Sequence, residues 1–470
     1  MKGVTYWQYH PFLPLDRQAE TLLPYIARIA PTRFGARLEW FDRGYGGGHT
    51  LCFRRHRGES PMEEVALAGP EAVLDGLAEE CDYEMFVRRD GAEGKSMLRL
   101  FRTGFVPGDA VVHYLHPLDD AYAFSGKALC SPSIAILPSG RFVVSMDLFA
   151  GRRPQNLTLL YYSDDQGATW HYLNDLFPCY WGKLFVHRGR LHMLAHAAEY
   201  GDLLIGASDD EGATWTAPTP IFRGSGMFCA SGPHKAPMPV IEHGGRLCTA
   251  IDFGSWEADR GHGQGMLSID AGSDLLKADN WALSDSFLRY DPSWPGAVVG
   301  QSSGALEGNM VVSPKGELIN MLRYQINDAQ PNHGRAIQLL ADADRPEKPL
   351  AFLRIVEMNG GSNSKFQLRQ DPATKKYFAI CSEYVDGMPN SMRSVLSLAA
   401  SDDLISWKIV KRLVDYRHLP PGDTGFQYCD FQFNGEDIVF VCRTAFNRPR
   451  NYHDANYTTF HIIKNFHSLA

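Results

Sequence analysis

Short apolar segments recur in pairs along most of the chain, and each pair is separated by a turn that usually carries glycine. Ile134-Ala135-Ile136 and Phe142-Val143-Val144 form the first pair, and Met310–Val312 with Leu318–Leu322 form a later one. Apolar runs of this length, bounded by turn residues, predict buried strands. The sequence therefore predicts six β-hairpins, with turns at Pro138–Gly140, His187–Gly189, Glu242–Gly245, Pro314–Gly316, Asp371–Lys376 and Asn434–Glu436.

An eight-residue motif occurs twice, since Ser163-Asp164-Asp165-Gln166-Gly167-Ala168-Thr169-Trp170 returns as Ser208-Asp209-Asp210-Glu211-Gly212-Ala213-Thr214-Trp215. Ser401–Trp407 is a copy without the glycine, and Ser268-Ile269-Asp270 leading to Trp281 is a looser one. In such a turn the Ser and Asp side chains bond the turn's own amides, Gly supplies a positive φ and Trp packs beneath. Repeats of this period predict stacked supersecondary units, and we assign the motif a structural role without catalysis.

These repeats resemble the Asp boxes of sialidases, which implies an all-β fold. The hairpins would then be the innermost strand pairs of the blades of a β-propeller over residues 107–470. We count six blades, or seven if a further blade lies in the connections around residues 286–306. Ala110–Leu115 is expected as the outer strand of the last blade, beside Tyr457–Ile463, because closing the ring removes exposed sheet edges.

The chain before the ring shows a different pattern. Residues 1–29 are interpreted as a lead-in, with a short helix over residues 10–30. Residues 30–106 resemble a fibronectin type III β-sandwich, on the evidence of Leu38–Phe41, Thr50–Arg54 and Leu77–Val87, where a leucine turn precedes a Tyr-containing strand. We expect this sandwich to pack against the propeller, with sugar binding as the alternative role.

Strand direction predicts which side chains gather at one rim of the ring. Each inner strand leaves that rim and each second strand returns to it, so the repeated Ser-Asp turns lie at the opposite rim. The residues nominated as catalytic on this rule are His196, His234, Asp252, Glu383 and Asp147. The residues nominated for substrate binding are Lys235, Arg323, Arg443, Tyr428, Trp181, Tyr200, Glu307, Asn309 and, from an overhanging loop, His333 and Arg335.

The nominated residue types suit an acidic sugar. Imidazole titrates near neutral pH and can act as acid or base, and a pair of carboxylates can serve as acid and as base or nucleophile. Arginine and lysine bind carboxylates, and aromatic rings offer stacking surfaces. The alternative for each residue is a charge at a strand end that is solvated or paired with a neighbour.

The family resemblance also sets limits on the chemistry. A typical sialidase opens its first blade with an Arg-Ile-Pro motif that contributes to an arginine triad, but here the stretch reads Cys130-Ser131-Pro132-Ser133-Ile134. Arg323 and Arg443 would supply two of the three arginines. The chain resembles the propeller ulvan lyases more closely, over most of residues 131–467, in segments such as Leu306–Asn309, Gly360–Phe366, Gly425–Tyr428 and His453–Asn456.

Three functions follow as hypotheses. The first is an exo-acting glycoside hydrolase that removes a terminal acidic or deoxy sugar from an oligosaccharide. The second is a lyase that eliminates at a uronate, although Pro233 and Thr249 stand where the ulvan lyases carry their catalytic Tyr and Arg. The third is a sugar-binding propeller without catalysis, which would show equivalent pockets between blades rather than one asymmetric site.

Composition narrows the partners. The 470 residues carry a formal charge of -8 and no Lys/Arg run, which argues against nucleic acid or an anionic membrane surface as a partner. The start of the chain lacks a signal-peptide core and the nine cysteines show no close CxxC pair, so we expect a cytoplasmic protein with reduced thiols. No cofactor is expected. A structural calcium held by backbone carbonyls in the central channel would leave no trace in the sequence, and neither would the oligomeric state.

Overall fold

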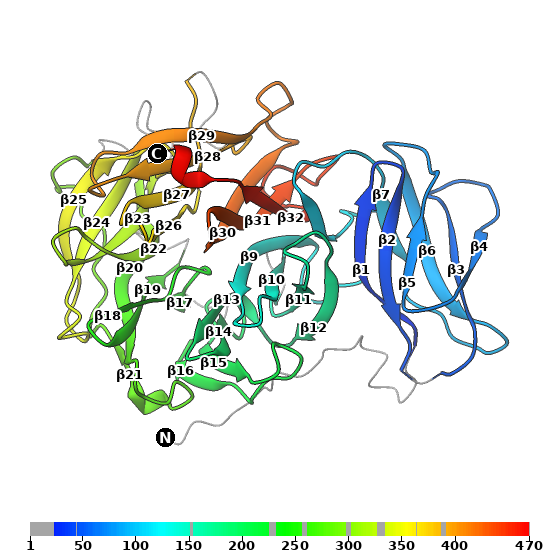
Figure 1. Ribbon diagram of the computed structural model, residues 1–470, viewed down its shortest axis with the longest axis horizontal. Coiled ribbons are helices and arrows are strands. Elements are labelled where there is room, and N and C mark those ends of the chain that lie inside the picture. The colour runs from blue at the N-terminus through cyan, green and yellow to red at the C-terminus, as the bar shows by residue number, and fades with distance from the viewer. Residues whose placement is uncertain are drawn as a thin grey trace.

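The computed structural model describes residues 23–43, 45–150, 154–224, 232–255, 261–297, 302–326, 334–362, 364–386 and 392–469. Within these ranges the chain forms antiparallel strands and two short 3-10 helices, η2 (Ala278–Asn280) and η3 (Phe466–Leu469). Figure 1 shows two bodies side by side, a ring of sheets and a smaller pair of sheets formed by the N-terminal segment. The fold is therefore all-β.

The described residues of the ring form six antiparallel sheets, and the first strands of these sheets surround its centre (Figure 1). In chain order the first three sheets contain β9 (Ala128–Ile136), β10 (Phe142–Phe149), β11 (Thr158–Ser163) and β12 (His171–Leu176); β13 (Tyr180–His187), β14 (Arg190–His196), β15 (Leu203–Ser208) and β16 (Thr219–Phe222); and β17 (Gly232–His234), β18 (Ile241–His243), β19 (Arg246–Gly254), β20 (His262–Asp270) and β21 (Trp281–Leu283).

The other three sheets follow the same plan. They contain β22 (Ser302–Val312), β23 (Leu318–Ile326), β24 (Arg335–Ala341) and β25 (Ala351–Glu357); β26 (Gln367–Gln370), β27 (Tyr377–Ser382), β28 (Val395–Ser401) and β29 (Lys408–Asp415); and β30 (Gly425–Asn434), β31 (Asp437–Ala445) and β32 (Tyr457–Ile463), completed by β8 (Ala110–Tyr114). All six hairpins predicted from the apolar pattern are present, because each predicted turn joins two paired strands.

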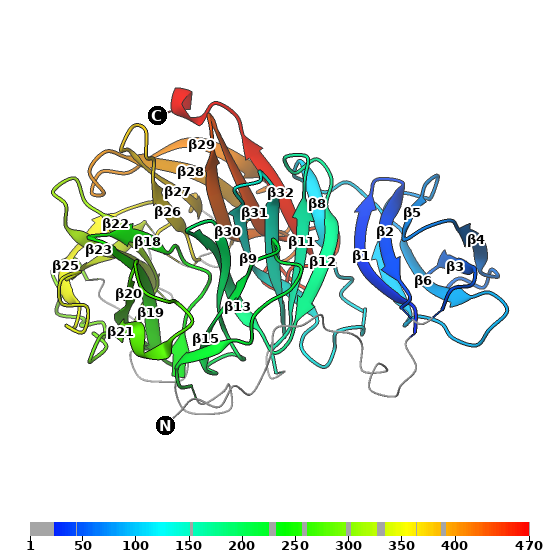
Figure 2. The same ribbon diagram turned by 60° about the horizontal axis from the view of Figure 1, so that its bottom comes forward.

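The ring closes as the sequence predicted. β8, which precedes the first sheet in the chain, pairs with β32 of the last sheet, so that Tyr114 lies opposite Tyr457 and Ala110 opposite Phe460. β9 also contacts both β13 and β30, and Figure 2 shows β8 beside β32 at the junction of the two chain ends of the ring. This pairing covers the outer edge of β32 and joins the two chain ends of the ring in one sheet, which stabilises the closed form.

Apolar side chains fill the space between neighbouring sheets. Ala135 and Val143 of the first sheet belong to the same buried cluster as Leu184 and Met193 of the second. The repeated Ser-Asp turns also have the predicted bonds. In the first copy Ser163 Oγ accepts from Gly167 N at 2.8 Å, and Asp165 accepts from Thr169 N at 2.8 Å. Trp170 is buried and donates to the carbonyl of Gly167 at 3.0 Å, which confirms a structural role.

The N-terminal body contains two sheets that share one core. One sheet joins β1 (Tyr25–Thr32), β2 (Gly35–Phe41) and β5 (Glu71–Leu74); the other joins β3 (His49–Arg55), β4 (Glu63–Leu67), β6 (Asp82–Arg89) and β7 (Arg99–Arg102). Ile29 and Leu38 of the first sheet pack with Phe53 and Met85 of the second. The predicted boundary at residue 30 and the helix over residues 10–30 need correction, because a strand already begins at Tyr25. Residues 1–22 lie outside the described part of the chain.

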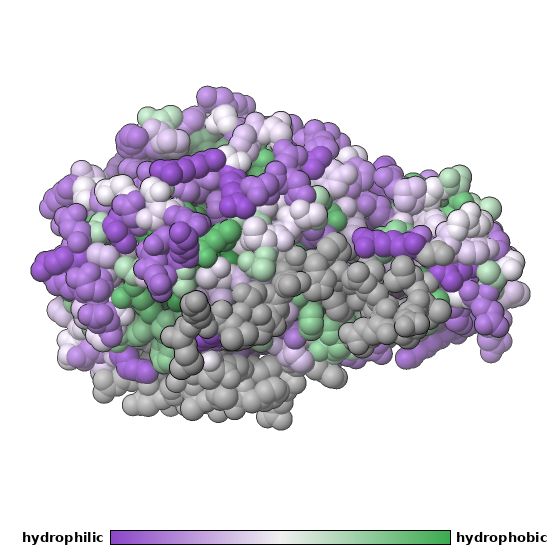
Figure 3. Space-filling view, turned by 90° about the horizontal axis from the view of Figure 1, so that it is seen from below, coloured by the Kyte–Doolittle hydropathy of each residue, from purple (hydrophilic) through white to green (hydrophobic). Residues whose placement is uncertain are grey.

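In the described part of the chain, no helix has the length and apolar character needed to cross a membrane. On the face seen from below, strongly polar side chains lie over both ends of the molecule, and apolar side chains form smaller separate patches between them (Figure 3).

Candidate active site

Four inner strands of the ring carry the same irregularity near the start of the strand. In β9, β13, β22 and β30 two residues face one residue of the second strand, which is the pattern of a β-bulge. The first extra residue has a left-handed backbone in every case, with φ values of 43° for Ser131, 52° for Trp181, 55° for Glu307 and 54° for Tyr428. Such conformations are uncommon for residues other than glycine and concentrate at functional sites.

Glu307, Tyr428 and Arg323 form a buried hydrogen-bonded cluster across the ring. The Tyr428 hydroxyl donates to Glu307 Oε1 at 2.6 Å, and Arg323 donates to Glu307 Oε2 at 2.9 Å. A third bond of 3.3 Å runs from Arg323 to the Tyr428 hydroxyl. Exposure is only 2% for Glu307, 3% for Arg323 and 8% for Tyr428. In this low-dielectric setting the charges interact more strongly than they would in water.

Two further guanidinium groups lie against Tyr428. The central carbon of Arg443 is 5.2 Å from the centre of the phenol ring, and that of Arg393 is 5.9 Å from it. Arg393 donates to Gln427 Oε1, and Arg443 donates to the carbonyl of His453 at 3.1 Å. Arg323 Nε has no hydrogen-bond partner among the described residues. Three arginines beside one phenol make a site suited to an anion.

The charges set the protonation states of this cluster. Burial by itself would raise the pKa of Glu307, but the charge of Arg323 and the hydrogen bonds from Tyr428 and Arg323 lower it below the usual value. Burial, together with the carboxylate of Glu307, raises the pKa of Tyr428 to about 12. Glu307 is therefore a carboxylate at neutral pH, and it accepts a hydrogen bond from the neutral phenol of Tyr428.

His234 and Asp252 lie beside Glu307 on its other side. Asp252 Oδ2 accepts from the Glu307 amide at 2.8 Å and lies 3.1 Å from His234 Nδ1. Burial raises the pKa of Asp252 to about 7 and lowers that of His234 to about 4. Asp252 Oδ1 has no partner among the described residues. Asp252 is thus an acid that can give up a proton near neutral pH, next to an uncharged imidazole.

Aromatic rings surround that imidazole. The ring centre of His234 is 4.3 Å from that of Trp181, 4.4 Å from that of His262 and 5.9 Å from that of Tyr200. The Tyr200 hydroxyl is 3.3 Å from His262 Nε2. The site therefore has two unlike sides, one lined by arginines and one by aromatic and imidazole rings.

Not every nominated residue belongs to this cluster. Asp147 bonds Thr158 at 2.6 Å and the amides of Trp181 and Gly182, so it supports the bulge of the next sheet, and burial raises its pKa well above the usual value. His196 bonds the carbonyl of Gly201 at 3.2 Å and meets the edge of Trp181, and burial lowers its pKa to about 3. Both residues lie behind the site rather than in it.

Three nominated residues make their bonds outside the cluster around Glu307: Glu383, Asn309 and Arg335. Glu383 accepts from Ser397 at 2.6 Å and from Arg412 of the outermost strand at 2.8 Å, so its carboxylate serves a pair outside the cluster. Asn309 accepts from the Leu368 amide at 2.9 Å and joins two inner strands. Arg335 donates to the carbonyl of Gly296. His333 lies outside the described residues, and Lys235 is buried near the axis of the ring.

Arg393 and His262 belong to the site and were missed from the sequence. The rule applied to the sequence used only the beginnings of first strands and the ends of second strands. Third strands run in the same direction as first strands, so their beginnings reach the same rim. His262 opens β20 and Arg393 lies two residues before β28, so extending the rule to third strands would have found both.

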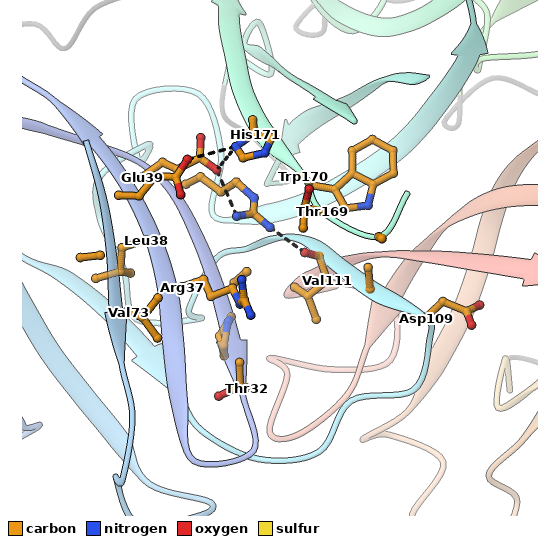
Figure 4. A pocket seen from close by; sticks show the side chains of 17 residues that line it. Thr32, Arg37, Leu38, Glu39, Val73, Asp109, Val111, Thr169, Trp170 and His171 are labelled. Carbon is orange, nitrogen blue, oxygen red and sulfur yellow. Dashed lines mark hydrogen bonds and ion pairs between the residues drawn. The ribbon is translucent and has the colours of Figure 1, made fainter. Parts of the chain in front are cut away.

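A separate pocket of about 350 Å³ lies between the N-terminal sheets and the first sheet of the ring. Figure 4 shows Glu39 facing His171 there, and their closest atoms are 3.5 Å apart, while Arg28 lies 3.2 Å from Glu39. None of the residues lining this pocket belongs to the cluster around Glu307. The Arg28–Glu39 pair lies within the N-terminal body, and the contact of His171 with Glu39 joins that body to the ring.

No group of three or more metal-ligating side chains occurs among the described residues. The described part of the channel carries Lys183, Lys235 and Lys365, each almost fully buried, around the carboxylate of Asp430. A positive lining of this kind disfavours a calcium ion on this stretch of the axis.

The chain matches no protein-family model and no curated protein. Solved structures do resemble it. The α-L-arabinanase of Penicillium chrysogenum complexed with arabinobiose has a TM-score of 0.50 at 12% identity, covering 76% of this chain and 97% of that one. A Hadza microbial sialidase has a TM-score of 0.50 at 14% identity, covering 96% of both chains. The α-L-arabinofuranosidase of Fusarium graminearum with arabinobiose has a TM-score of 0.50 at 12% identity, covering 76% and 98%. The fold is that of the sialidase-like β-propellers.

Proposed function

We propose that the protein is a glycoside hydrolase that removes a terminal sugar bearing a carboxylate from an oligosaccharide. The observation that carries the proposal is the Tyr428–Glu307–Arg323 cluster, with Arg393 and Arg443 against the same phenol. The burial of these side chains favours a single terminal sugar over an internal residue of a polymer. The names of the solved structures with this fold, an arabinanase, a sialidase and an arabinofuranosidase, support a hydrolase.

The three arginines bind the sugar carboxylate. Planar guanidinium groups match a carboxylate with two parallel hydrogen bonds, and they remain charged when buried. Arg443 also replaces the arginine absent from Cys130–Ile134. Its guanidinium lies 5.3 Å from the Phe149 ring, and its charge acts on Cys130 and Asp147 of the first sheet, opposing the larger effect of burial on the pKa of each. The acidic sugar of the initial hypothesis is therefore favoured over the deoxy sugar.

Tyr428 is the nucleophile. Its oxygen attacks the anomeric carbon while Glu307 takes the phenol proton, and the glycosidic bond breaks as Asp252 gives its proton to the leaving oxygen. Water then attacks the anomeric carbon, Asp252 takes the proton of that water, and Glu307 returns its proton to Tyr428. Two displacements retain the anomeric configuration. A tyrosine nucleophile is the known exception among glycosidases that otherwise use two carboxylates.

The finer description of the fold belongs to the same proposal. The six sheets are six blades, and the two N-terminal sheets are a fibronectin type III-like sandwich. The alternating order of the strands and the shared core of the N-terminal sheets support this description.

The proposal is tested with a panel of fluorogenic sialosides and glucuronides, with product masses recorded. We expect release of one acidic sugar with a gain of water, lost in Tyr428→Phe and retained in Tyr377→Phe, a buried tyrosine that bonds the Val312 carbonyl outside the site. A product with no added water that absorbs in the ultraviolet would favour the uronate lyase instead. Saturable binding of acidic sugars without turnover would favour the sugar-binding propeller.

A further inference from the structure

The inner strands carry a second ring of polar side chains, two positions beyond the bulges. Asp430 lies at its centre. Asp430 Oδ2 accepts from Ser133 at 2.7 Å, from the Ile134 amide at 2.9 Å and from Lys183, and Gln367 donates to Oδ1. These bonds join the first, second, fifth and sixth sheets at the axis of the ring. The Asp430 carboxylate has no exposed surface, so solvent does not reach the ring of side chains where Asp430 lies.

Cationic side chains exceed carboxylates in this ring. Arg369 lies 3.7 Å from Asp430 Oδ1, and Lys365 donates to the carbonyl of Cys429 at 2.8 Å. With Lys183 and Lys235 there are four cationic groups around the carboxylate of Asp430. Lysine, unlike arginine, presents a compact charge that must be neutralised or hydrogen-bonded when it is taken out of water.

Among these cationic groups, Lys235 is the one whose charged atom makes no hydrogen bond to a described residue. Its side chain is buried, with the residue only 2% exposed, and Nζ has no hydrogen-bond partner among the described residues. Burial and then the charge of Lys183 lower the pKa of Lys235 to about 7, and the charges of Asp252 and Asp430 oppose that change. An ammonium group with three donors and no acceptor is incomplete in a sealed interior.

Nearby acceptors do not complete it. Asp430 is occupied by Ser133, Lys183 and Gln367, Asp252 Oδ2 already serves His234 and the Glu307 amide, and Asp252 Oδ1 makes no hydrogen bond to Lys235. The missing partner is therefore an acceptor with negative charge. The burial of Asp430 and Lys235 favours a single small ion over an organic molecule.

We propose that a small monovalent anion of the size of chloride binds at the axis of the ring beside Lys235 Nζ, with Lys183 and Lys365 around it. The ion neutralises the charge beneath the rim and fixes the inner strands of the second, third and fifth sheets relative to one another. This role is independent of the proposed hydrolysis. A carboxylate of the substrate is the other source of the same chemistry, and the experiment separates the two.

Bromide provides the direct test. Crystals of the full chain grown without sugar and soaked in sodium bromide are measured at the bromine absorption edge. We expect one anomalous peak within hydrogen-bond reach of Lys235 Nζ. The absence of a peak there would overturn the proposal, and so would density for an acidic sugar at Lys235 in crystals soaked with that sugar.

Melting temperature provides the second test, with sodium chloride compared with sodium gluconate at equal ionic strength. Chloride should raise the melting temperature saturably in the wild type and in Lys464→Met, a surface control whose lysine side chain is 68% exposed and paired with Asp437. The chloride effect should vanish in Lys235→Met. Equal melting temperatures of the wild type in the two salts would contradict the proposal, and if Lys235→Met does not fold, the bromide peak of the wild type decides.

Discussion

The two rims of the ring differ in what is repeated from sheet to sheet. At one rim Ser163–Trp170 and Ser208–Trp215 repeat the same bonds, since Ser163 and Ser208 each accept from the following glycine amide at 2.8 Å. At the other rim the bulges repeat in backbone geometry, but the side chains they carry are a serine, a tryptophan, a glutamate and a tyrosine. The turns that repeat the same side chains thus have a structural role. The bulges repeat only the backbone geometry, and their different side chains contribute to one asymmetric site.

Among substitutions that test this difference between the rims, the largest effect on activity is expected at Glu307. Glu307→Gln removes the base for Tyr428 and leaves the volume unchanged, so kcat on an acidic glycoside should fall by about 10²–10⁴-fold. Glu383→Gln is the matched control, because that carboxylate is also buried but pairs with Arg412. A similar loss of kcat in both variants would show that the effect is general and not a property of the site.

The next effect concerns the arginines. Arg393→Lys keeps a positive charge but loses the planar pair of donors, so KM for an acidic glycoside should rise by about 10- to 100-fold with a smaller change in kcat. Steady-state kinetics on an acidic and an uncharged glycoside check this. An equal rise in KM on both substrates would mean that Arg393 does not recognise the carboxylate.

The pH dependence gives a third test. Asp252 must be protonated to act as an acid, and its pKa is raised to about 7. The rate constant kcat/KM should therefore fall about tenfold per pH unit above pH 7, as the proton is lost. Asp252→Asn should remove this alkaline limb and lower the rate at the optimum. A wild-type profile that stays flat from pH 6 to pH 9 would exclude Asp252 as the acid.

The smallest expected effect lies at the opposite rim. Asp165→Ala removes the acceptor for Thr169 N and the Ser163 hydroxyl, so the free energy of unfolding should fall by about 1–3 kcal/mol while kcat is unchanged. Asp164→Ala, whose mostly exposed carboxylate pairs with Arg141, should cost about 0–1 kcal/mol. Urea unfolding and kinetics on the same samples check both values, and a loss of kcat in Asp165→Ala would break the contrast between the rims.

The sequence predicted the hairpins and the closure by Ala110–Tyr114 because both depend on apolar periodicity and chain direction. It also predicted that Glu307, Arg323 and Tyr428 share a rim. It did not separate Glu307 from Glu383, because the partner of Glu383 is Arg412 on the outermost strand, and strand order alone does not indicate where a side chain points. The bulges were not predicted either, because their left-handed positions are occupied by Glu, Tyr and Trp instead of the glycine that usually marks such a conformation.

The most direct test of the central claim is to trap the sugar on the enzyme. A fluorinated acidic glycoside that slows the second displacement is incubated with the protein, and the digested peptides are analysed by mass spectrometry. The proposed mechanism predicts one sugar adduct on the peptide containing Tyr428, located on the tyrosine oxygen and absent in Tyr428→Phe. An adduct on Glu307 or Asp252, or turnover of the parent glycoside by Tyr428→Phe at the wild-type rate, would contradict it.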